Sequence, residues 1–219
     1  MAKKEPHPEE ELLVLHERWV KAAREHLKEI ILAAVLLVLA AALWAGFSYY
    51  RQNRENKASI LYAQALMKNK NQREQALREV IKRYGGTAAS LQAHLSLYEI
   101  YLEEENLSKA FEELSFLRRK AKKPWSAFLD LGLGYLQEDQ NRLKESEKDY
   151  LRAAKARVGL ETLAYLDLAR VAEIAGHYEA AVKYYQEFLS HNPQGPILDF
   201  VQVQLAKLSA RLETKNKGG

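Results

Sequence analysis

A residue pattern that recurs about every 35 positions constrains the fold of this chain more than any other sequence feature. Small side chains stand at intervals of 34, 36 and 35 residues, at Ala76, Ala110, Ser146 and Ala181. A larger residue follows four positions after each of them, in order Val80, Leu114, Tyr150 and Tyr185. Small residues let paired helices approach closely, and the larger ones fill the seam to the next pair. Because one helix pair cannot bury both of its faces, the period predicts a stack of pairs with a shared core.

The last third of the sequence carries this pattern most completely. It reads Tyr165-x-x-Leu168-Ala169-x-x-Ala172, then Gly176-x-Tyr178-x-x-Ala181-x-x-x-Tyr185-x-x-Phe188, and closes at Pro193. This arrangement resembles the tetratricopeptide repeat, and the resemblance implies an all-α solenoid. We predict about four repeats over residues 51–195, the first degenerate, and then a capping helix and polar tail over residues 196–219. In the third repeat, Leu131-Gly132-x-x-Tyr135 precedes Ser146, which predicts about two extra residues in the turn between its helices.

A run of 21 residues without a charged side chain lies between Glu29 and Arg51. As a helix it would be about 31 Å long, which matches a hydrocarbon core of about 30 Å. Trp44 and two tyrosines stand at its end, where aromatic rings prefer the headgroup layer. We therefore predict one transmembrane helix over residues 30–50 that contacts the lipid bilayer. A cleaved signal peptide is disfavoured because 29 residues, seven of them acidic, precede the run, and a buried core helix rarely lacks charge for so long.

The N-terminal residues 1–29 read as a polar tail followed by an amphipathic helix. From Leu12 onward, apolar residues recur every three to four positions up to Leu27. Trp19 and Leu27 then lie either on the membrane surface or against a partner helix. Basic residues flank both ends of the uncharged run in similar numbers, so charge alone leaves the membrane orientation open.

No motif of catalysis or cofactor binding stands out. The chain has no cysteine, and its six histidines lack the spacing of metal ligands. Gly132-x-Gly134 resembles the start of a dinucleotide fingerprint, but no strand precedes it and position 137 is Gln. The basic run over residues 118–123 could contact anionic lipid or RNA, although a charged helix end is the simpler interpretation. A net charge of +4 is too small to indicate nucleic acid, and we predict no enzyme activity, cofactor, metal or small-molecule substrate.

The first helix of each pair lines the concave face of a tetratricopeptide superhelix, where partner proteins dock. By the repeat pattern, eight residues would form this face: Leu95, Glu99, Leu102, Leu129, Leu133, Leu136, Leu166 and Arg170. This face is apolar, and it lacks the Lys and Asn pairs that hold a C-terminal carboxylate in chaperone-binding members of the family. Its leucines could bind unfolded or partly folded chains, or they could equally be packing residues.

The complete arrangement resembles the YfgM-like family, which are ancillary subunits of the SecYEG translocon. The resemblance rests on His16-Glu17-Arg18-Trp19 before the uncharged run, on its end Trp44-Ala45-Gly46-Phe47-Ser48-Tyr49-Tyr50, and on the repeats that follow. It implies a single-pass protein of the bacterial inner membrane, with the N-terminus in the cytoplasm and the repeats in the periplasm. It also implies partners: the translocon, periplasmic chaperones or emerging client chains. The alternative function is an adaptor in cell division or outer-membrane assembly.

Overall fold

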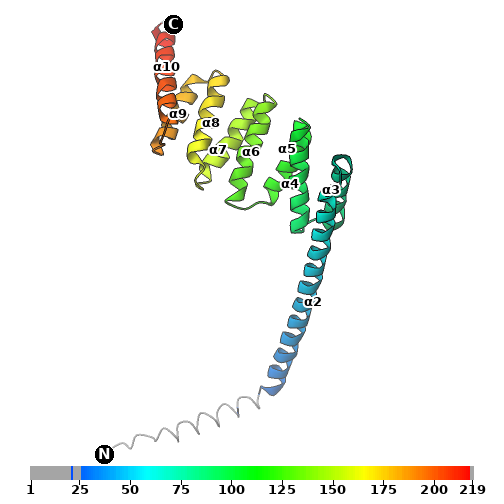
Figure 1. Ribbon diagram of the computed structural model, residues 1–219. Helices are drawn as coiled ribbons and strands as arrows, with labels where there is room; N and C mark the ends of the chain where they lie inside the picture. Colours follow the sequence, from blue (N-terminus) through cyan, green and yellow to red (C-terminus); the bar gives the residue numbers. More distant parts are fainter. Residues whose placement is uncertain (1–20, 22–25, 218–219) are drawn as a thin grey trace, which may run out of the picture. The chain divides into compact units, whose positions relative to one another are not determined.

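The computed structural model describes Lys21 and residues 26–217, and the regular structure in this part of the chain is α-helical (Figure 1). The helices are α2 (Leu27–Leu66), α3 (Lys70–Tyr84), α4 (Ala88–Glu103), α5 (Leu107–Lys120), α6 (Trp125–Asp139), α7 (Leu143–Lys155), α8 (Glu161–Ile174), α9 (Tyr178–Ser190) and α10 (Ile197–Lys217). This confirms the predicted all-α class. Most of the expected amphipathic helix before residue 30 lies outside the described residues.

The chain divides into two compact units, residues 1–56 and residues 57–219, and α2 contributes to both. In the first unit the apolar side chains of α2 are exposed, including Leu37 at 71%, Leu43 at 75% and Trp44 at 74%. Among the described helices, α2 is the one long and apolar enough to cross a membrane, judged by length and composition. The exposed apolar side chains of this segment can therefore contact lipid.

Three helix pairs of the second unit end their first helix in the same way. The pairs α4–α5, α6–α7 and α8–α9 are each joined by three residues, of which the second has positive φ: Glu105 (54°), Asn141 (57°) and Gly176 (76°). The next residue donates its N–H to the carbonyl five residues earlier, at 2.7–2.8 Å, from Asn106 to Tyr101, Arg142 to Gln137 and His177 to Ala172. This is the Schellman arrangement, which satisfies carbonyls that a helix end leaves unpaired.

These bonds correct the expected alignment of the third repeat. They place Gln137, and not Tyr135, at the position that Tyr101 and Ala172 occupy in the neighbouring repeats. The turn between α6 and α7 is no longer than the others, so the expectation of two extra residues there was wrong. Additional residues lie in the connections between pairs, which lengthen from three residues before α4 to four before α6 and five before α8. The repeat pattern in α6 therefore shifts by two residues.

The small residues of the second helices lie at the predicted seams. Ala110, Ser146 and Ala181 are fully buried, whereas Ala76 of the degenerate first unit is partly buried. Tyr150 is also fully buried, and a Cβ at Gly134 would lie within 3 Å of three carbons of its ring. The core continues through the stack as three clusters of buried side chains, the last of which includes Val201 and Leu208 of α10. The structure thus confirms the predicted solenoid of helix pairs.

Candidate protein-binding groove

The corrected register changes which residues of α6 share a face with the predicted residues of α4 and α8. Leu95, Glu99 and Leu102 of α4 now correspond to Leu131, Tyr135 and Glu138 of α6, and to Leu166, Arg170 and Glu173 of α8. The earlier assignment of Leu129, Leu133 and Leu136 to this face was two residues out of register. Leu133 and Leu136 are buried and pack in the same cluster as Leu114 of α5. These two leucines are packing residues, one of the two interpretations that the sequence left open.

The predicted residues of α4 and α8 differ in their exposure. Leu95, Glu99 and Leu102 are exposed, and Leu166 is partly buried. Leu129 of α6 is also partly buried. On α4, then, the predicted face presents two leucines and one carboxylate to solvent.

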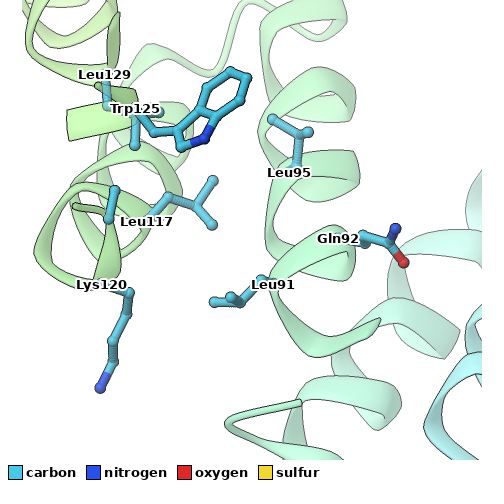
Figure 2. A pocket seen from close by; sticks show the side chains of 8 residues that line it. Leu91, Gln92, Leu95, Leu117, Lys120, Trp125 and Leu129 are labelled. Atoms are coloured by element: carbon cyan, nitrogen blue, oxygen red, sulfur yellow. The ribbon is translucent and has the colours of Figure 1, made fainter. Parts of the chain in front are cut away.

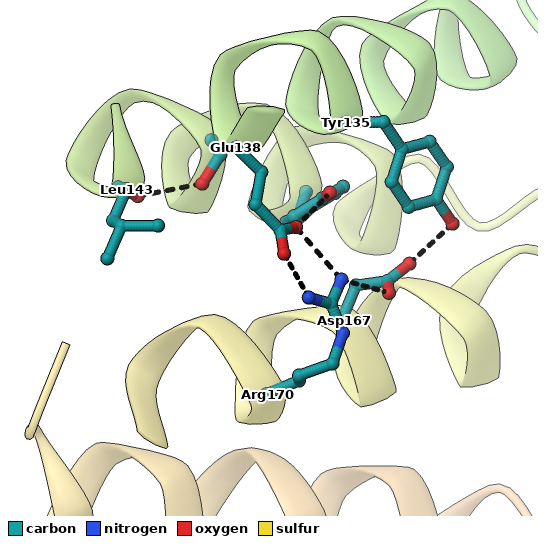
Figure 3. Close-up of polar contacts among 7 residues, drawn as sticks. Tyr135, Glu138, Leu143, Asp167 and Arg170 are labelled. Carbon is teal, nitrogen blue, oxygen red and sulfur yellow. Dashed lines mark hydrogen bonds and ion pairs between the residues drawn. The ribbon is translucent and has the colours of Figure 1, made fainter. Parts of the chain in front are cut away.

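Arg170 lies in a polar network between α6 and α8 (Figure 3). Its guanidinium makes two bonds to Glu138, one of them 2.9 Å long, and donates to Asp167 at 2.9 Å. The hydroxyl of Tyr135 donates to the other oxygen of Asp167 at 2.6 Å, and the hydroxyl of Tyr150 donates to Glu138 at 2.9 Å. Both carboxylates and the guanidinium therefore have partners within the protein.

The ionisation of this network follows from these contacts. Burial raises the pKa of Glu138, but the bonds from Arg170 and Tyr150 outweigh burial, so the net shift of its pKa is downward. The bonds to Glu138 raise the pKa of Arg170 further above its usual range. Burial and the bond to Asp167 also raise the pKa of Tyr135. At neutral pH Glu138 is therefore ionised, Arg170 is cationic, and the phenols of Tyr135 and Tyr150 are neutral. The network ties neighbouring repeats together.

Sequence reasoning identified Arg170 and missed its partners. Asp167 stands three residues before Arg170 on one helix face, a spacing that indicates an ion pair. Tyr135 and Glu138 are 32 residues away from their partners in α8, close to one repeat length, and no local pattern points to them. The two-residue error in register also moved both of them off the predicted face.

A pocket between α4 and α6 brings together Leu95 and Leu129, two of the predicted residues (Figure 2). We call it the α4–α6 pocket, and its volume is about 350 Å³. It is lined by Leu91, Gln92 and Leu95 of α4, Leu117 and Lys120 of α5, Ala121, and Trp125 and Leu129 of α6. Trp125 lies at the edge of the pocket and is 68% exposed. The centre of its ring is 6.0 Å from the centre of the Phe128 ring. An exposed indole beside a hollow of leucines is a typical anchor of a protein interface.

Two other titratable clusters in the described residues are satisfied internally. The buried carboxylate of Asp130 accepts from Arg118 at 2.7 Å and from Arg152 at 3.1 Å. His94 pairs with Glu113 at 2.5 Å and stacks on a phenylalanine ring. No group of three or more residues that could hold a metal occurs in the described part of the chain. These contacts serve helix packing.

The two glycines that resemble a dinucleotide fingerprint also have packing roles. Both lie inside helix α6, where no strand-to-helix turn exists to cradle a phosphate. A Cβ at Gly132 would lie 3.0 Å from the end of the Leu114 side chain, and Gly134 lies against the ring of Tyr150. Their small size is thus explained by close helix contacts.

Stacked helix pairs with an exposed groove define the class of α-solenoid protein-interaction scaffolds. The sequence matches the tetratricopeptide repeat-like domain over residues 22–154, and the chain belongs to this family. The matched region begins before the apolar segment of α2 and ends in α7. No curated protein matches the sequence.

Two solved structures of other repeat proteins resemble the chain. One contains the nearly identical tetratricopeptide-like repeats of a chain assigned as a kinesin light chain in Podospora anserina. It has 12% sequence identity and a TM-score of 0.51, and the match covers 76% of this chain and 88% of that one. The second is pilF of Pseudomonas aeruginosa, with 12% identity, a TM-score of 0.42, and coverage of 77% and 95%. At these identities, the first likeness shows the fold alone.

Proposed function

We propose that this protein is a membrane-anchored scaffold that accompanies the Sec translocon and binds periplasmic chaperones or emerging chains. The observation that carries this proposal is the combination, in one chain, of an exposed apolar helix of membrane length with a tetratricopeptide-like solenoid. The resemblance of residues 16–19 and 44–50 to the YfgM-like family supports the translocon as the membrane partner. The solenoid supplies a protein-binding surface and the proposed anchor keeps it at the membrane.

Anchoring has a direct physical benefit for a scaffold of this kind. A protein confined to the membrane meets another membrane protein at a high effective concentration, so weak contacts through the groove suffice for association. Tetratricopeptide-like folds are typically non-catalytic protein-binding scaffolds, and the network around Arg170 holds helices together. We therefore propose a binding role without an enzymatic step.

Co-purification in mild detergent tests the proposed partner. The full chain, tagged after Gly219, should bring down translocon subunits, whereas a fragment of residues 51–219 should lose them because it lacks the membrane segment. Recovery of cell-division or outer-membrane assembly proteins in place of the translocon would support the alternative adaptor function. Recovery of neither group with the full chain would refute the proposed complex.

Membrane orientation needs its own measurement because the flanking charges do not decide it. A reporter fused after Gly219 that is active only in the periplasm should give signal. A reporter that is active only in the cytoplasm should stay silent. The reverse result would contradict the proposed periplasmic location of the repeats.

A further inference from the structure

We infer that the α4–α6 pocket binds a polypeptide segment that presents a large apolar side chain next to an acidic one. This inference deepens the proposed binding function and rests on it, because it names the chemistry of the partner. Figure 2 shows the pocket between Leu91 and Leu95 on one side and Trp125 and Leu129 on the other, with Leu117 between them. Two independent features, the lining and the charge at the rim, lead to this partner.

The lining selects an apolar side chain. Six of its eight residues are apolar, and Leu91, Leu95 and Trp125 are exposed large hydrophobic residues. A volume of about 350 Å³ falls within the range of roughly 300–1,000 Å³ typical of ligand pockets. A leucine or phenylalanine from a partner would therefore remove several exposed apolar groups from water at once.

The rim selects an acidic neighbour for that side chain. Lys120 lines the pocket, and Arg119 and Lys122 flank it in the sequence, all three with exposed side chains, whereas the Lys123 ammonium donates to the carbonyl of Ala156 at 3.1 Å. The pocket lining contains no carboxylate, and neither Lys120 nor Lys122 forms an ion pair with another described residue. The Lys120 ammonium lies 5.8 Å from the ring centre of Phe116, which leaves its hydrogen-bond donors available. A carboxylate beside the inserted side chain would meet this uncompensated positive charge.

The shape of the site favours a polypeptide over a bilayer surface. Basic residues beside an exposed tryptophan are also found on proteins that bind anionic lipid. A bilayer, however, contacts protruding side chains, whereas Leu91, Leu95 and Leu129 line a hollow between two helices. A single side chain on an extended or helical segment can enter such a hollow.

The test uses the fluorescence of Trp125 in the full chain. The protein contains three tryptophans, so Trp19→Phe and Trp44→Phe substitutions leave Trp125 as the sole indole. This variant is placed in nanodiscs of zwitterionic phosphatidylcholine. Three dye-labelled eight-residue probes are added: Gly-Ser-Leu-Phe-Asp-Glu-Ser-Gly, its basic form with Lys-Arg in place of Asp-Glu, and its polar form with Ser-Gly in place of Leu-Phe. We expect the acidic apolar probe to bind most tightly and to shift the Trp125 emission to shorter wavelength.

Matched substitutions locate the binding. Leu95→Glu should weaken the acidic apolar probe at least tenfold, whereas Leu163→Glu on α8 should leave it unchanged, since both leucines are 44% exposed and only Leu95 lines the pocket. Lys120→Glu should weaken this probe about fivefold and strengthen the basic probe, whereas Lys144→Glu on α7 should do neither. Circular dichroism of each variant checks that the helices remain folded.

Several outcomes would overturn the inference. These are equal binding of the three probes, no binding of any probe, or equal effects of the Leu95 and Leu163 substitutions. A Trp125 shift with phosphatidylglycerol vesicles but not with the acidic apolar probe would identify lipid as the ligand and refute the polypeptide assignment. If a probe binds without shifting Trp125 emission, the solenoid binds segments at another place, so the pocket assignment fails while the proposed scaffold function stands.

Discussion

Gly134→Ala is the substitution that tests the helix packing of the third repeat most sharply. The glycine lies inside α6, where alanine by itself stabilises a helix by about 1 kcal/mol. A Cβ at this position would lie 2.6 Å from Cδ1 and 2.9 Å from Cζ of Tyr150. Unstrained carbon contacts are about 3.5–4.0 Å, so the ring or the helix has to move by about 1 Å.

The ring of Tyr150 has little freedom to make that movement. It is fully buried, it meets the ring of Tyr135 edge-on at 5.4 Å, and its hydroxyl is bonded to Glu138. Overpacking of a dense core costs about 1–3 kcal/mol. Because this ring is held on several sides, we expect the upper part of that range, about 2–3 kcal/mol. Subtracting the gain of about 1 kcal/mol in helix propensity, we expect Gly134→Ala to lower the free energy of unfolding by about 1–2 kcal/mol.

Unfolding of the full chain in mild detergent, followed by circular dichroism during a urea titration, measures this change. Gly132→Ala is the matched control, because its Cβ would meet only the flexible end of Leu114 and the net effect should be close to zero. In a Tyr150→Leu background the clash is gone, so adding Gly134→Ala should become neutral or stabilising. The double-mutant cycle then gives a coupling free energy of about 2 kcal/mol.

A Gly134→Ala protein that is as stable as the parent, or more stable, would refute this reasoning. It would mean that Tyr150 does not pack over Gly134. The corrected alignment of the third repeat would then lose its packing support, and the alignment on Gly132 would need to be reconsidered.

Three further predictions concern the network, a phenol and the two-part organisation. Arg170→Met should lower the free energy of unfolding by about 1–2 kcal/mol, since Glu138 and Asp167 would lose their cation, and Arg119→Met should not. Because the folded-state pKa of Glu138 is lowered, this difference should shrink as the pH falls below about 4.5, which unfolding titrations at several pH values would show. Burial and a neighbouring carboxylate raise the pKa of Tyr185 to about 12. The neutral phenol therefore contributes to the free energy of unfolding below pH 10, and this contribution is lost as the pH rises to 12. In the Tyr185→Phe variant, the free energy of unfolding should fall less over this alkaline range. A fragment of residues 51–219 should be soluble and helical by size-exclusion chromatography and circular dichroism, and aggregation of the fragment would contradict the separation into anchor and solenoid.

The sequence predicted the architecture because the signals were repeated. The small residues Ala110, Ser146 and Ala181 are each fully buried, and each one supports the alignment of the others. An uncharged run of 21 residues likewise needs no tertiary information to be recognised. Both features depend on spacing along the chain, which sequence shows directly.

The alignment of the third repeat failed for a physical reason. Helix α6 contains two candidate glycines, Gly132 and Gly134, and leucines on either side of both, so apolar spacing alone does not choose between them. The deciding feature is the backbone of the following turn, where Asn141 adopts positive φ. Asparagine tolerates that conformation. Aligning Asn141 with Glu105 and Gly176 would have identified Gly134 as the small residue of the first helix in the third repeat.

The candidate site was harder to predict than the fold because its residues meet across repeats. Tyr135 and Asp167 are 32 positions apart, and their bond depends on the register that was misassigned. The α4–α6 pocket depends in addition on the path of the connection before α6, which places Trp125 opposite Leu95. Lengths of connections vary from repeat to repeat, so periodicity does not specify that geometry.

Photocrosslinking from the groove in intact membranes tests the proposed scaffold function most directly. A photoreactive residue would replace Leu95 in the groove, and a second one would replace the exposed Glu112 of α5 as the control. We predict covalent adducts with translocon subunits, chaperones or client chains from position 95, well above those from position 112. Equal adduct yields from the two positions, or none from position 95, would contradict a scaffold that binds proteins through this face.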